Sequence, residues 1–490
     1  MSQPTLRLPG AQGQPLSFFW NGRRLAALTG DSVAEALLAN GIRTLAWTRK
    51  SHRPMGLSGI YVNGVLARVD GVPNVRLDQC PVRDGMRVEM QNCWPSPRFD
   101  LLQLSRALPA RWIQGGFEHT NLVPSGGRLF QHWERLLAFL AGVAKPASDR
   151  RQVAIPPATK VVTEVLVIGA GRSGCEAANA AARQGKTVVL VTRDERIGRA
   201  ALNAGRPVPE LDPRVQCLFG IEVFGAYREG KLLVGAPLDT SRGAIAFAAT
   251  QVILATGRRA AVPLVGGAWL PGVMDARTAL ALATERRIAP GLAVAVVGDD
   301  DAEEVANRLR ALAVNVVLVG DVQRLRRIRG HDRVRGIHLQ GNRRCDAVVF
   351  AGPTTFDDSL SFQGGAQGRL QLRTGADPFI RVGSASLDEQ RLPPPYDASA
   401  LLCPCFDVSA AEVDALLDQG IQDLEVIKRL TSCGMGPCQG QPCWHSLREF
   451  VAWRLGTTPE RLSKPSLRPP RRAITVAQAA GLADVVEPLQ

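Results

Sequence analysis

The chain has 490 residues, 45% of them hydrophobic and 21% charged, which is typical of a globular protein of roughly two to four domains. No apolar run approaches the ~18 residues of a membrane span, and the N-terminus lacks the apolar core of a signal peptide, so we expect a cytoplasmic protein. The net charge is +14, but the arginines are dispersed and lack interleaved aromatics even in their densest run, 324–335. This favours a solvated face or an acidic partner over nucleic-acid binding.

The first hundred residues predict a separate unit of short strands. Residues 16–42 have the pattern of a hairpin followed by a helix, with Asp31 or Ser32 as the helix cap. Residues 59–78 add further strands with glycine turns. This order favours a β-grasp domain. A short apolar helix at 132–145 and a proline-rich, charged linker should then connect it to the next domain.

Residues 164–194 carry a dinucleotide-binding pattern, in which an apolar strand runs into a glycine loop, an alanine-rich helix and a second apolar strand. Gly169 permits the tight turn, Gly171 lets the backbone approach a pyrophosphate, and Gly174 lets helix and strand pack closely. Arg172 and Ser173, between these glycines, are further cofactor-binding candidates.

The second strand of this unit lacks the acidic residue that usually binds the ribose hydroxyls. Thr192 and Arg193 occupy its end, and Asp194 follows one or two places late. Arg193 is a candidate cofactor contact, and it could meet the 2′-phosphate of NADP instead. Asp194 could also serve by a shift of register.

Two later segments complete the predicted dinucleotide fold. Ala255, Thr256 and Gly257 follow an apolar strand, as in flavoproteins with two dinucleotide domains. Residues 291–321 repeat the strand, loop, helix and strand pattern, but Asp299, Asp300 and Asp301 follow Gly298. These three carboxylates would repel a pyrophosphate, so we expect this second nucleotide site to be empty.

The cysteines near the C-terminus are the strongest chemical signal. Half of the ten cysteines fall in one region, at 403, 405, 433, 438 and 443. Ser409 and Glu412 predict a capped helix between the pairs, a second helix follows over 423–430, and the glycines after it free backbone N–H groups to approach sulfur. This arrangement favours an iron-sulfur cluster, with a zinc site or metal-free buried cysteines as the alternatives.

These segments also carry a resemblance to known families. The Cys-x-Cys pair with the loop IKRLTSCGMGPCQGQPC resembles the BFD-like [2Fe-2S] segment in alpha subunits of bacterial hydrogen cyanide synthase, opine oxidases and D-hydroxyproline dehydrogenase. The resemblance implies Cys403, Cys405, Cys438 and Cys443 as the ligands, with Cys433 as a fifth, neighbouring thiol. By resemblance to the flavoprotein family, Gly383 is a further cofactor contact, and Ser384 stands where an aspartate is usual.

The N-terminal part is similar to sarcosine oxidase alpha chains, on SHRPMG, VDGVPNVR and DGMRVEMQNCWPS. Related small subunits hold a plant-type [2Fe-2S] cluster in this fold, but the matching positions here are Leu57, Val62 and Val65. Cys80 and Cys93 alone cannot hold a cluster, so the resemblance implies a cluster-free domain.

The fold class that follows is α/β. It has two Rossmann-like dinucleotide-binding domains of the disulfide-reductase flavoprotein type, an N-terminal β-grasp-like domain and a small helical BFD-like [2Fe-2S] domain. We expect the domains at 1–100, 161–395 and 396–490, with a connection at 101–160.

The resemblance implies an electron-transfer subunit of a heteromeric flavin-dependent dehydrogenase or oxidase. It implies a [2Fe-2S] cluster and FAD at an eroded site, with FMN at a subunit interface as a further candidate. The implied partner is a beta flavoprotein of the D-amino-acid-oxidase type, which oxidises the C–N bond of an amino acid, opine or secondary amine. A small additional subunit is a second candidate partner. The alternatives are a scaffold subunit with vestigial nucleotide sites and a stand-alone NAD(P)H-dependent flavin oxidoreductase.

Overall fold

The computed structural model describes residues 5–486, except 49, 60–63, 98, 108–129, 133–134, 136–153, 228–229, 262, 368–371, 374–377, 388–395, 442 and 473. The chain forms two compact units, each made of three segments: unit 1 is 1–149, 260–353 and 391–464, and unit 2 is 150–259, 354–390 and 465–490. The predicted helix at 132–145 lies almost entirely outside the described residues. The finer domain boundaries predicted from the sequence stay a prediction.

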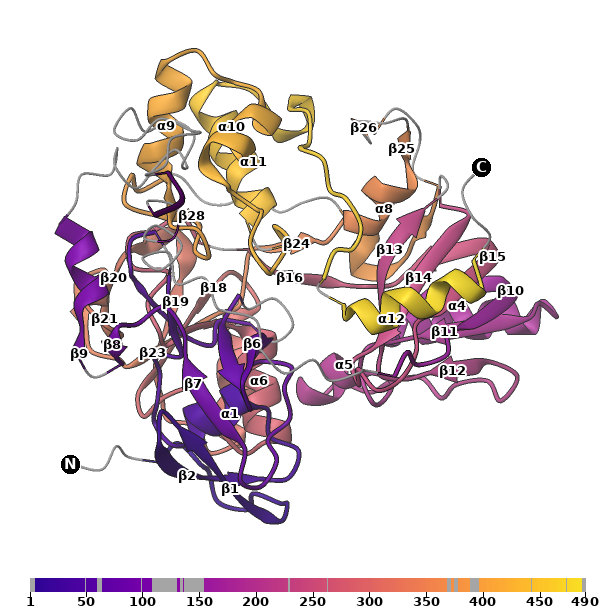
Figure 1. Cartoon of the computed structure of the whole chain (residues 1–490), viewed down its shortest axis with the longest axis horizontal. Coiled ribbons are helices and arrows are strands. Elements are labelled where there is room, and N and C mark those ends of the chain that lie inside the picture. The colour runs from indigo at the N-terminus through magenta and orange to yellow at the C-terminus, as the bar shows by residue number, and fades with distance from the viewer. Residues whose placement is uncertain are drawn as a thin grey trace. The chain divides into compact units, whose positions relative to one another are not determined.

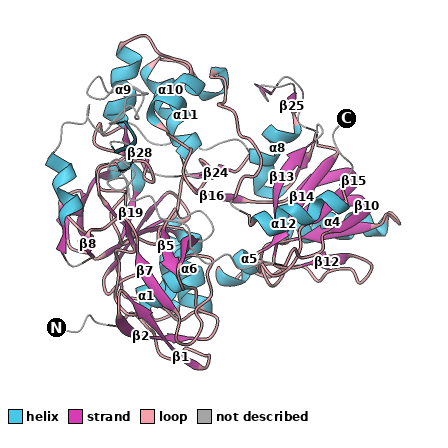
Figure 2. Cartoon of the chain, in the orientation of Figure 1, coloured by secondary structure: helices cyan, strands magenta, loops and turns pink. Residues whose placement is uncertain are grey.

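The N-terminal segment of unit 1 has the predicted β-grasp arrangement (Figures 1 and 2). Its five-stranded sheet has the order β2-β1-β7-β5-β6, in which β1 and β7 are parallel and the other neighbours antiparallel. Two hairpin turns use Asn-Gly and Asp-Gly pairs with positive φ, at Asn21 and Asp70. The elements are β1 (Pro15–Trp20), β2 (Arg23–Leu28), α1 (Val33–Ala39), β3 (Ala46–Trp47), β4 (Pro54–Met55), β5 (Leu66–Val69), β6 (Val72–Arg76), β7 (Arg87–Met90), β8 (Pro95–Ser96), β9 (Phe99–Asp100) and the 3-10 helix η1 (Leu101–Ala107).

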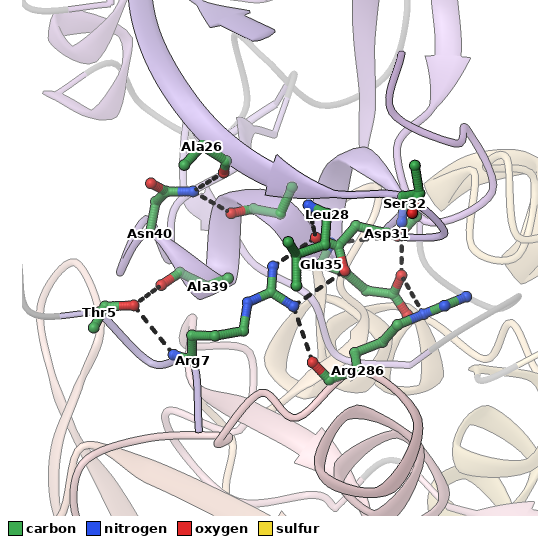
Figure 3. A network of polar contacts seen from close by, with 12 residues as sticks. Thr5, Arg7, Ala26, Leu28, Asp31, Ser32, Glu35, Ala39, Asn40 and Arg286 are labelled. Atoms are coloured by element: carbon green, nitrogen blue, oxygen red, sulfur yellow. Dashed lines mark hydrogen bonds and ion pairs between the residues drawn. The ribbon is translucent and has the colours of Figure 1, made fainter. Parts of the chain in front are cut away.

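Helix α1 begins with a capping box, and of the two caps expected it is Ser32 that accepts from the backbone N–H of Glu35. Asp31 has another role, shown in Figure 3: its carboxylate accepts from Arg7 and from the Leu28 backbone N–H. Arg7 also donates to the Arg286 carbonyl, and Arg286 pairs with Glu35 at 3.5 Å. These contacts join the β-grasp segment to the second α/β segment inside unit 1.

The second α/β segment of unit 1 contains a parallel sheet of order β17-β23-β18-β19 and a small antiparallel sheet β20-β21-β22. Its sheets pack through a core of Leu270, Val297, Ile328 and Val348. The elements are β17 (Val273–Asp275), α6 (Ala276–Glu285), β18 (Val294–Gly298), α7 (Ala302–Ala311), β19 (Val316–Asp321), η3 (Val322–Arg324), β20 (Leu325–Gly330), β21 (Val334–Leu339), β22 (Asn342–Arg343) and β23 (Ala347–Phe350).

The C-terminal segment of unit 1 is helical, as predicted. Ser409 caps the first helix by accepting from the Glu412 N–H, and Asp423 caps the second. Leu402, Val413, Ile427 and other apolar side chains form one core with three of the cysteines. The elements are β28 (Leu401–Cys403), β29 (Val408–Ser409), α9 (Ala410–Asp418), α10 (Leu424–Thr431), α11 (Cys443–Arg454) and η5 (Pro459–Arg461).

Unit 2 is built on a mixed sheet of order β12-β11-β10-β15-β14-β13, with β27 added beside β15. Strands β10, β11, β12, β15 and β27 are parallel, as the dinucleotide pattern predicts. The elements are β10 (Thr159–Ile168), α4 (Arg172–Arg183), β11 (Val188–Val191), α5 (Arg199–Asn203), β12 (Gln216–Leu218), β13 (Ile221–Tyr227), β14 (Leu232–Pro237), β15 (Ile245–Leu254), β16 (Arg258–Ala260), β24 (Thr354–Phe356), α8 (Ser359–Gly364), β25 (Ala366–Gln367), β26 (Leu372–Arg373), β27 (Ile380–Arg381), η4 (Gly383–Ser386), α12 (Val476–Gly481) and η6 (Leu482–Asp484).

The C-terminal tail belongs to unit 2, where it contributes two buried arginines. Arg471 donates to Glu222 at 3.2 Å and also to Asp357, and Arg472 lies 3.3 Å from Glu222. Glu222 is 4% exposed, so these arginines neutralise a carboxylate that would be costly to bury alone. No helix in the described part of the chain combines the length and the apolarity needed to cross a membrane.

Candidate cofactor-binding sites

Five cysteines converge in unit 1. Cys403 ends β28 and Cys405 lies in the turn after it, while Cys433 and Cys438 belong to the loop between α10 and α11 and Cys443 is the first residue of α11. Four of them are buried, and Cys405 is partly exposed. The strand and the two helices therefore present thiols from two distant stretches of sequence to one place.

The contacts between the sulfur atoms form a closed ring of four thiols. Cys403 contacts Cys405 and Cys443, and Cys438 contacts the same two residues. The Sγ atoms of Cys405 and Cys438 are 3.5 Å apart. Two sulfurs bound to one tetrahedral metal lie about 3.8 Å apart, so Cys405 and Cys438 have a spacing suited to sharing one metal ion.

Cys433 lies outside this ring, against one of its edges. Its thiol contacts those of Cys403 and Cys443, and the three Sγ atoms lie within 4.8 Å of one another. The ring of four is the ligand set that the sequence resemblance implied, and the structure adds the position of the fifth thiol.

The thiols differ in how readily they ionise. The pKa of Cys403 lies well below its usual value because three neighbouring thiols donate hydrogen bonds to its sulfur. The pKa of Cys438 is lowered in the same way, first by Cys405. The pKa values of the other three are raised, each chiefly because its thiol donates to Cys403. Each of the two stretches of sequence thus supplies one cysteine whose lowered pKa favours the thiolate, which is the form that binds metals.

Backbone N–H groups of the cysteine loop also reach the sulfurs. Gly434 donates to Cys403 and Gly440 donates to Cys438. Both glycines have φ of 75°, and an added Cβ would lie 2.1 Å and 1.9 Å, respectively, from atoms of the Trp444 ring. Only glycine fits at these two positions, and N–H to sulfur bonds of this kind tune the reduction potential of iron-sulfur clusters.

The β-grasp segment does not offer a second cluster site. Leu57 and Val65, which stand at predicted ligand positions, are buried apolar residues with 3% and 0% exposure, and Val62 lies outside the described residues. Residues 13–93 contain Cys80 and Cys93 as their only cysteines. Burial raises the pKa of both thiols, that of Cys93 to about 11, which disfavours metal-binding thiolates there.

The β-grasp segment instead packs against the cysteine ring. A Cβ added to Gly64 would lie 2.6 Å from the Cys405 Sγ, so this backbone covers the partly exposed thiol closely. Lys50 pairs with Glu412 at 2.6 Å, and the Ser51 N–H donates to buried Asp407, two residues after Cys405. The β-grasp segment thereby holds the turn that carries Cys405.

In unit 2, the predicted glycines shape the N-terminus of α4. Gly169 has φ of 109°, and an added Cβ would lie 2.4 Å from the Ala255 carbonyl. A Cβ on Gly174 would lie 1.9 Å from the Gly169 carbonyl, so only glycine lets helix and strand pack this closely. Gly171 caps the helix without a side chain, and a Cβ there would meet nothing within 4 Å. The space beside Gly171 is open where a pyrophosphate would approach the helix N-terminus.

The carboxyl ends of the parallel strands bring further predicted residues to the same place. Gly383 follows β27, has φ of 62°, and lies against Ser173 of α4, where an added Cβ would be 2.1 Å from its Oγ. The Thr256 Oγ1 is buried and has no hydrogen-bond partner among the described residues. Gly257 has φ of 69°. An unsatisfied hydroxyl beside a glycine-lined helix N-terminus fits a bound dinucleotide that supplies the missing partner.

Arg172 and Arg193 are engaged with protein carboxylates. Arg172 forms a surface pair with Glu176 at 2.9 Å, one helical turn away. Arg193 lies 4.0 Å from Glu222, which also holds Arg471 and Arg472. A 2′-phosphate would have to compete with Glu222 for Arg193, so the geometry favours FAD over NADP.

The second dinucleotide-like loop has an acidic rim. Asp299, Asp300 and Asp301 are exposed, and Glu303 and Glu304 follow in the first turn of α7. Carboxylates are favourable at a helix N-terminus, but they take the place that a nucleotide phosphate would need. A Cβ on Gly298 would also lie 2.8 Å from Ala351, so this glycine is needed for packing.

Sequence reasoning missed Arg258, which organises the turn after β27. Its buried guanidinium donates to the Ser384 carbonyl at 2.8 Å and to the carbonyls of Thr354 and Leu387. It also missed the partners of Arg471 and Arg472. The Arg-Pro-Pro-Arg-Arg run is visible in the sequence, but the carboxylates it meets lie more than a hundred residues away.

Comparisons with known proteins match three segments of the chain. Family models match residues 13–93 (2Fe-2S iron-sulfur cluster binding domain), 163–340 (pyridine nucleotide-disulphide oxidoreductase) and 400–482 (sarcosine oxidase A3 domain). The structure of L-proline dehydrogenase from P. horikoshii superimposes with a TM-score of 0.70 at 21% identity, covering 98% of this chain and 99% of that one. This similarity confirms the predicted fold class.

Three curated proteins are similar in sequence. The alpha chain of sarcosine oxidase from Rhizobium meliloti is 30% identical over 340 residues, which are 63% of this chain and 34% of that protein. An opine oxidase subunit from the same organism is 34% identical over 88 residues (18% and 19% of the two chains), and hydrogen cyanide synthase subunit HcnB of Pseudomonas aeruginosa is 30% identical over 73 (15% and 14%). The matched regions span about a third of the length of the first relative and less of the other two.

These matches confirm the resemblance to alpha subunits of heteromeric flavin-dependent amine-oxidising enzymes, and they support a [2Fe-2S] cluster and FAD as the cofactors. The cluster-domain match falls on the β-grasp segment, whose two cysteines are too few to hold a cluster. The cysteines that fit a cluster lie instead within residues 400–482.

Proposed function

We propose that this chain is the electron-transfer subunit of a heteromeric flavin-dependent dehydrogenase or oxidase. The observation that carries the proposal is the closed ring of Cys403, Cys405, Cys438 and Cys443 in a chain that also has a glycine-shaped dinucleotide site. The oxidation of the C–N bond of an amino acid, an opine or a secondary amine is assigned to a partner subunit. The resemblance to subunits of sarcosine oxidase, opine oxidase and hydrogen cyanide synthase supports this assignment.

The cysteine ring would hold the [2Fe-2S] cluster. The donor set fits, because the ring consists of four thiols, and two of these have lowered pKa values and accept backbone N–H bonds. A bound cluster supplies a centre that takes up and releases one electron at a time. The N–H groups of Gly434 and Gly440 stabilise negative charge on the sulfurs, and the packing of Gly64 over Cys405 limits the access of water.

The dinucleotide site of unit 2 would hold FAD through Gly169, Gly171 and Gly174, with Thr256 and Gly383 near the same helix terminus. A bound flavin supplies a centre that exchanges two electrons. The backbone at the α4 N-terminus would orient the pyrophosphate, and the Thr256 hydroxyl offers a hydrogen bond that no described residue takes up. FMN at the interface between subunits is retained as a prediction of the resemblance.

The partner is proposed to be a beta flavoprotein of the D-amino-acid-oxidase type. A small additional subunit is a further candidate partner. The proposed location of the complex is the cytoplasm. Support comes from the relatives, each of which is a subunit by name. The net charge of +14 would suit an acidic surface on that partner.

Both alternatives are disfavoured by specific observations. A stand-alone NAD(P)H-dependent oxidoreductase needs a nicotinamide-nucleotide site, but the second loop presents Asp299, Asp300 and Asp301 where the phosphates would lie. A scaffold with vestigial sites has no need for five converging cysteines, or for a buried Thr256 hydroxyl without a hydrogen-bond partner among the described residues.

The test is to purify the full chain anaerobically and to measure iron, acid-labile sulfide, released flavin and the visible spectrum. The proposal expects about two iron and two sulfide per chain, with FAD. Cys405→Ser and Cys438→Ser should lose the cluster, whereas Cys80→Ser, in the β-grasp segment, should keep it. Zinc without sulfide, or no metal, would overturn the cluster assignment.

Electron transfer is tested by photoreduction of the flavin followed by electron paramagnetic resonance. We expect the signal of a reduced [2Fe-2S] cluster to appear in the wild type and to be absent in Cys438→Ser. Bleaching of the flavin by NADH or NADPH alone would favour the stand-alone oxidoreductase. The substrate class is tested by adding sarcosine, proline and opines to the complex that copurifies with the tagged chain and recording which compound reduces the cluster.

A further inference from the structure

Cys433 is a fifth buried thiol at a site that needs four. A [2Fe-2S] cluster takes four protein ligands, and the ring of Cys403, Cys405, Cys438 and Cys443 supplies them without Cys433. Its side chain is nonetheless completely buried, in the core that also contains Cys403 and Cys443.

The thiol of Cys433 lies at one particular edge of the ring. It contacts Cys403 and Cys443, with all three Sγ atoms within 4.8 Å of one another. The opposite edge is formed by Cys405 and Cys438, which are 3.5 Å apart. The thiol of Cys433 therefore makes hydrogen bonds to two of the four ring thiols and to neither of the other two.

The distances allow Cys433 to replace either neighbour. Because the Cys433 Sγ lies within 4.8 Å of both neighbouring sulfurs, it is the protein sulfur beside either ligand position when that position becomes vacant. The Cys433 backbone is held in place, because its N–H donates to the Thr431 Oγ1 at 3.2 Å and Ser432 before it has φ of 61°. With the backbone held, the Cys433 sulfur moves toward the vacant position by rotation of its side chain, and the iron closes the remaining distance.

We propose that Cys433 is a reserve ligand for this edge of the site. When the sulfur of Cys403 or Cys443 is lost, Cys433 ligates the iron in its place and the cluster is retained. Cys405 and Cys438 have no such replacement. The proposal rests on the cluster assignment made above and deepens it.

The test compares alanine variants, because alanine offers no donor atom to iron. The full chain is purified anaerobically as Cys403→Ala, Cys443→Ala, Cys405→Ala and Cys438→Ala, with Cys433→Ala as the matched control. Iron and sulfide content, the visible spectrum and the electron paramagnetic resonance of the reduced cluster are recorded. If an alanine variant does not fold, the valine variant at the same position, which also offers no donor atom to iron, replaces it.

We expect Cys403→Ala and Cys443→Ala to keep most of their iron and sulfide, with a shifted resonance because one ligand has changed position. Cys405→Ala and Cys438→Ala should lose nearly all of both, and Cys433→Ala should match the wild type. Adding Cys433→Ala to Cys403→Ala should abolish the retained cluster. Circular dichroism of every variant confirms that the loss is not a loss of fold.

Equal loss of the cluster in all four single ligand variants would overturn the reserve-ligand proposal and leave the cluster assignment standing. A Cys403→Ala/Cys433→Ala variant that keeps its cluster would also overturn it. A wild type without iron and sulfide would overturn both the assignment and the reserve role.

Discussion

Replacing Arg471 by methionine removes a buried charge that two carboxylates share. Arg471 donates to Asp357 and, at 3.2 Å, to Glu222, and its side chain is 8% exposed. Methionine keeps most of the apolar bulk but supplies no donor. Both carboxylates are themselves almost completely buried, so the missing charge cannot be replaced by water without local opening.

The size of the effect follows from the pKa of Asp357. Burial by itself would raise it, but Arg471 and Arg259 outweigh burial and hold the pKa at about 2, against an ordinary value of 3.8. At ~1.4 kcal/mol per pKa unit, the ionised carboxylate contributes about 2–3 kcal/mol of stability at neutral pH. Because the folded-state pKa is lowered, this contribution is present above the unfolded-state value and is lost as the pH falls from about 4 to about 2.

The total cost of the substitution should be larger, because Glu222 loses one of its arginine partners as well. Removing one member of a buried ionic network costs about 3–5 kcal/mol. In Arg471→Met, burial without its partner should raise the pKa of Asp357, so the carboxyl group takes up a proton in the folded state as the pH is lowered. The cost should therefore shrink between pH 7.5 and pH 5.

The two units can unfold separately, so a single global unfolding free energy is not well defined for this chain. Hydrogen exchange with mass spectrometry instead measures the opening free energy of each region. We expect faster exchange in β13 and α12 at pH 7.5, and little change in α9. Arg468→Met, three residues earlier and exposed, is the matched control and should change stability by less than about 0.5 kcal/mol. A cost for Arg471→Met below about 1 kcal/mol, or one that grows as the pH falls, would refute the reasoning.

Four further substitutions test the two sites. Gly171→Ala should keep the fold but lose FAD, because its Cβ would meet nothing within 4 Å but would enter the space assigned to the pyrophosphate. Gly174→Ala should lose both the fold and FAD, because its Cβ would lie 1.9 Å from a backbone carbonyl. Thermal unfolding measures the fold, and flavin release measures FAD. Gly64→Ala should lower iron content without lowering FAD, because its Cβ would lie 2.6 Å from the Cys405 Sγ. Thr256→Val should stabilise the flavin-free chain by about 1 kcal/mol and weaken FAD binding, because it removes an unsatisfied buried hydroxyl.

Each of these has an outcome that contradicts it. Wild-type flavin content in Gly171→Ala would mean that no pyrophosphate approaches that glycine. Unchanged iron in Gly64→Ala would show that the backbone over Cys405 yields without disturbing the ring. Unchanged FAD affinity in Thr256→Val would show that the hydroxyl makes no bond to the cofactor.

Local patterns in the sequence were sufficient for most of the fold. The Asn-Gly and Asp-Gly pairs specify hairpins because both central residues take positive φ, and Ser409 specifies a helix start because its hydroxyl satisfies a backbone N–H. The glycine spacing of the dinucleotide loop predicted a close approach between α4 and β10, since a Cβ on Gly174 would collide with a backbone carbonyl. In each case the cause lies within a few residues of its effect.

The sequence by itself also predicted metal binding at the cysteine site, because a Cys-x-Cys pair and a glycine-rich cysteine loop suit few other functions. Only the tertiary structure decided which thiols touch, with Cys433 beside Cys403 and Cys443, and which carboxylates Arg471 meets. It also decided that the β-grasp backbone at Gly64 covers Cys405. These contacts join segments tens to hundreds of residues apart. Their geometry is set by the packing of whole segments, and no local periodicity or spacing carries that information.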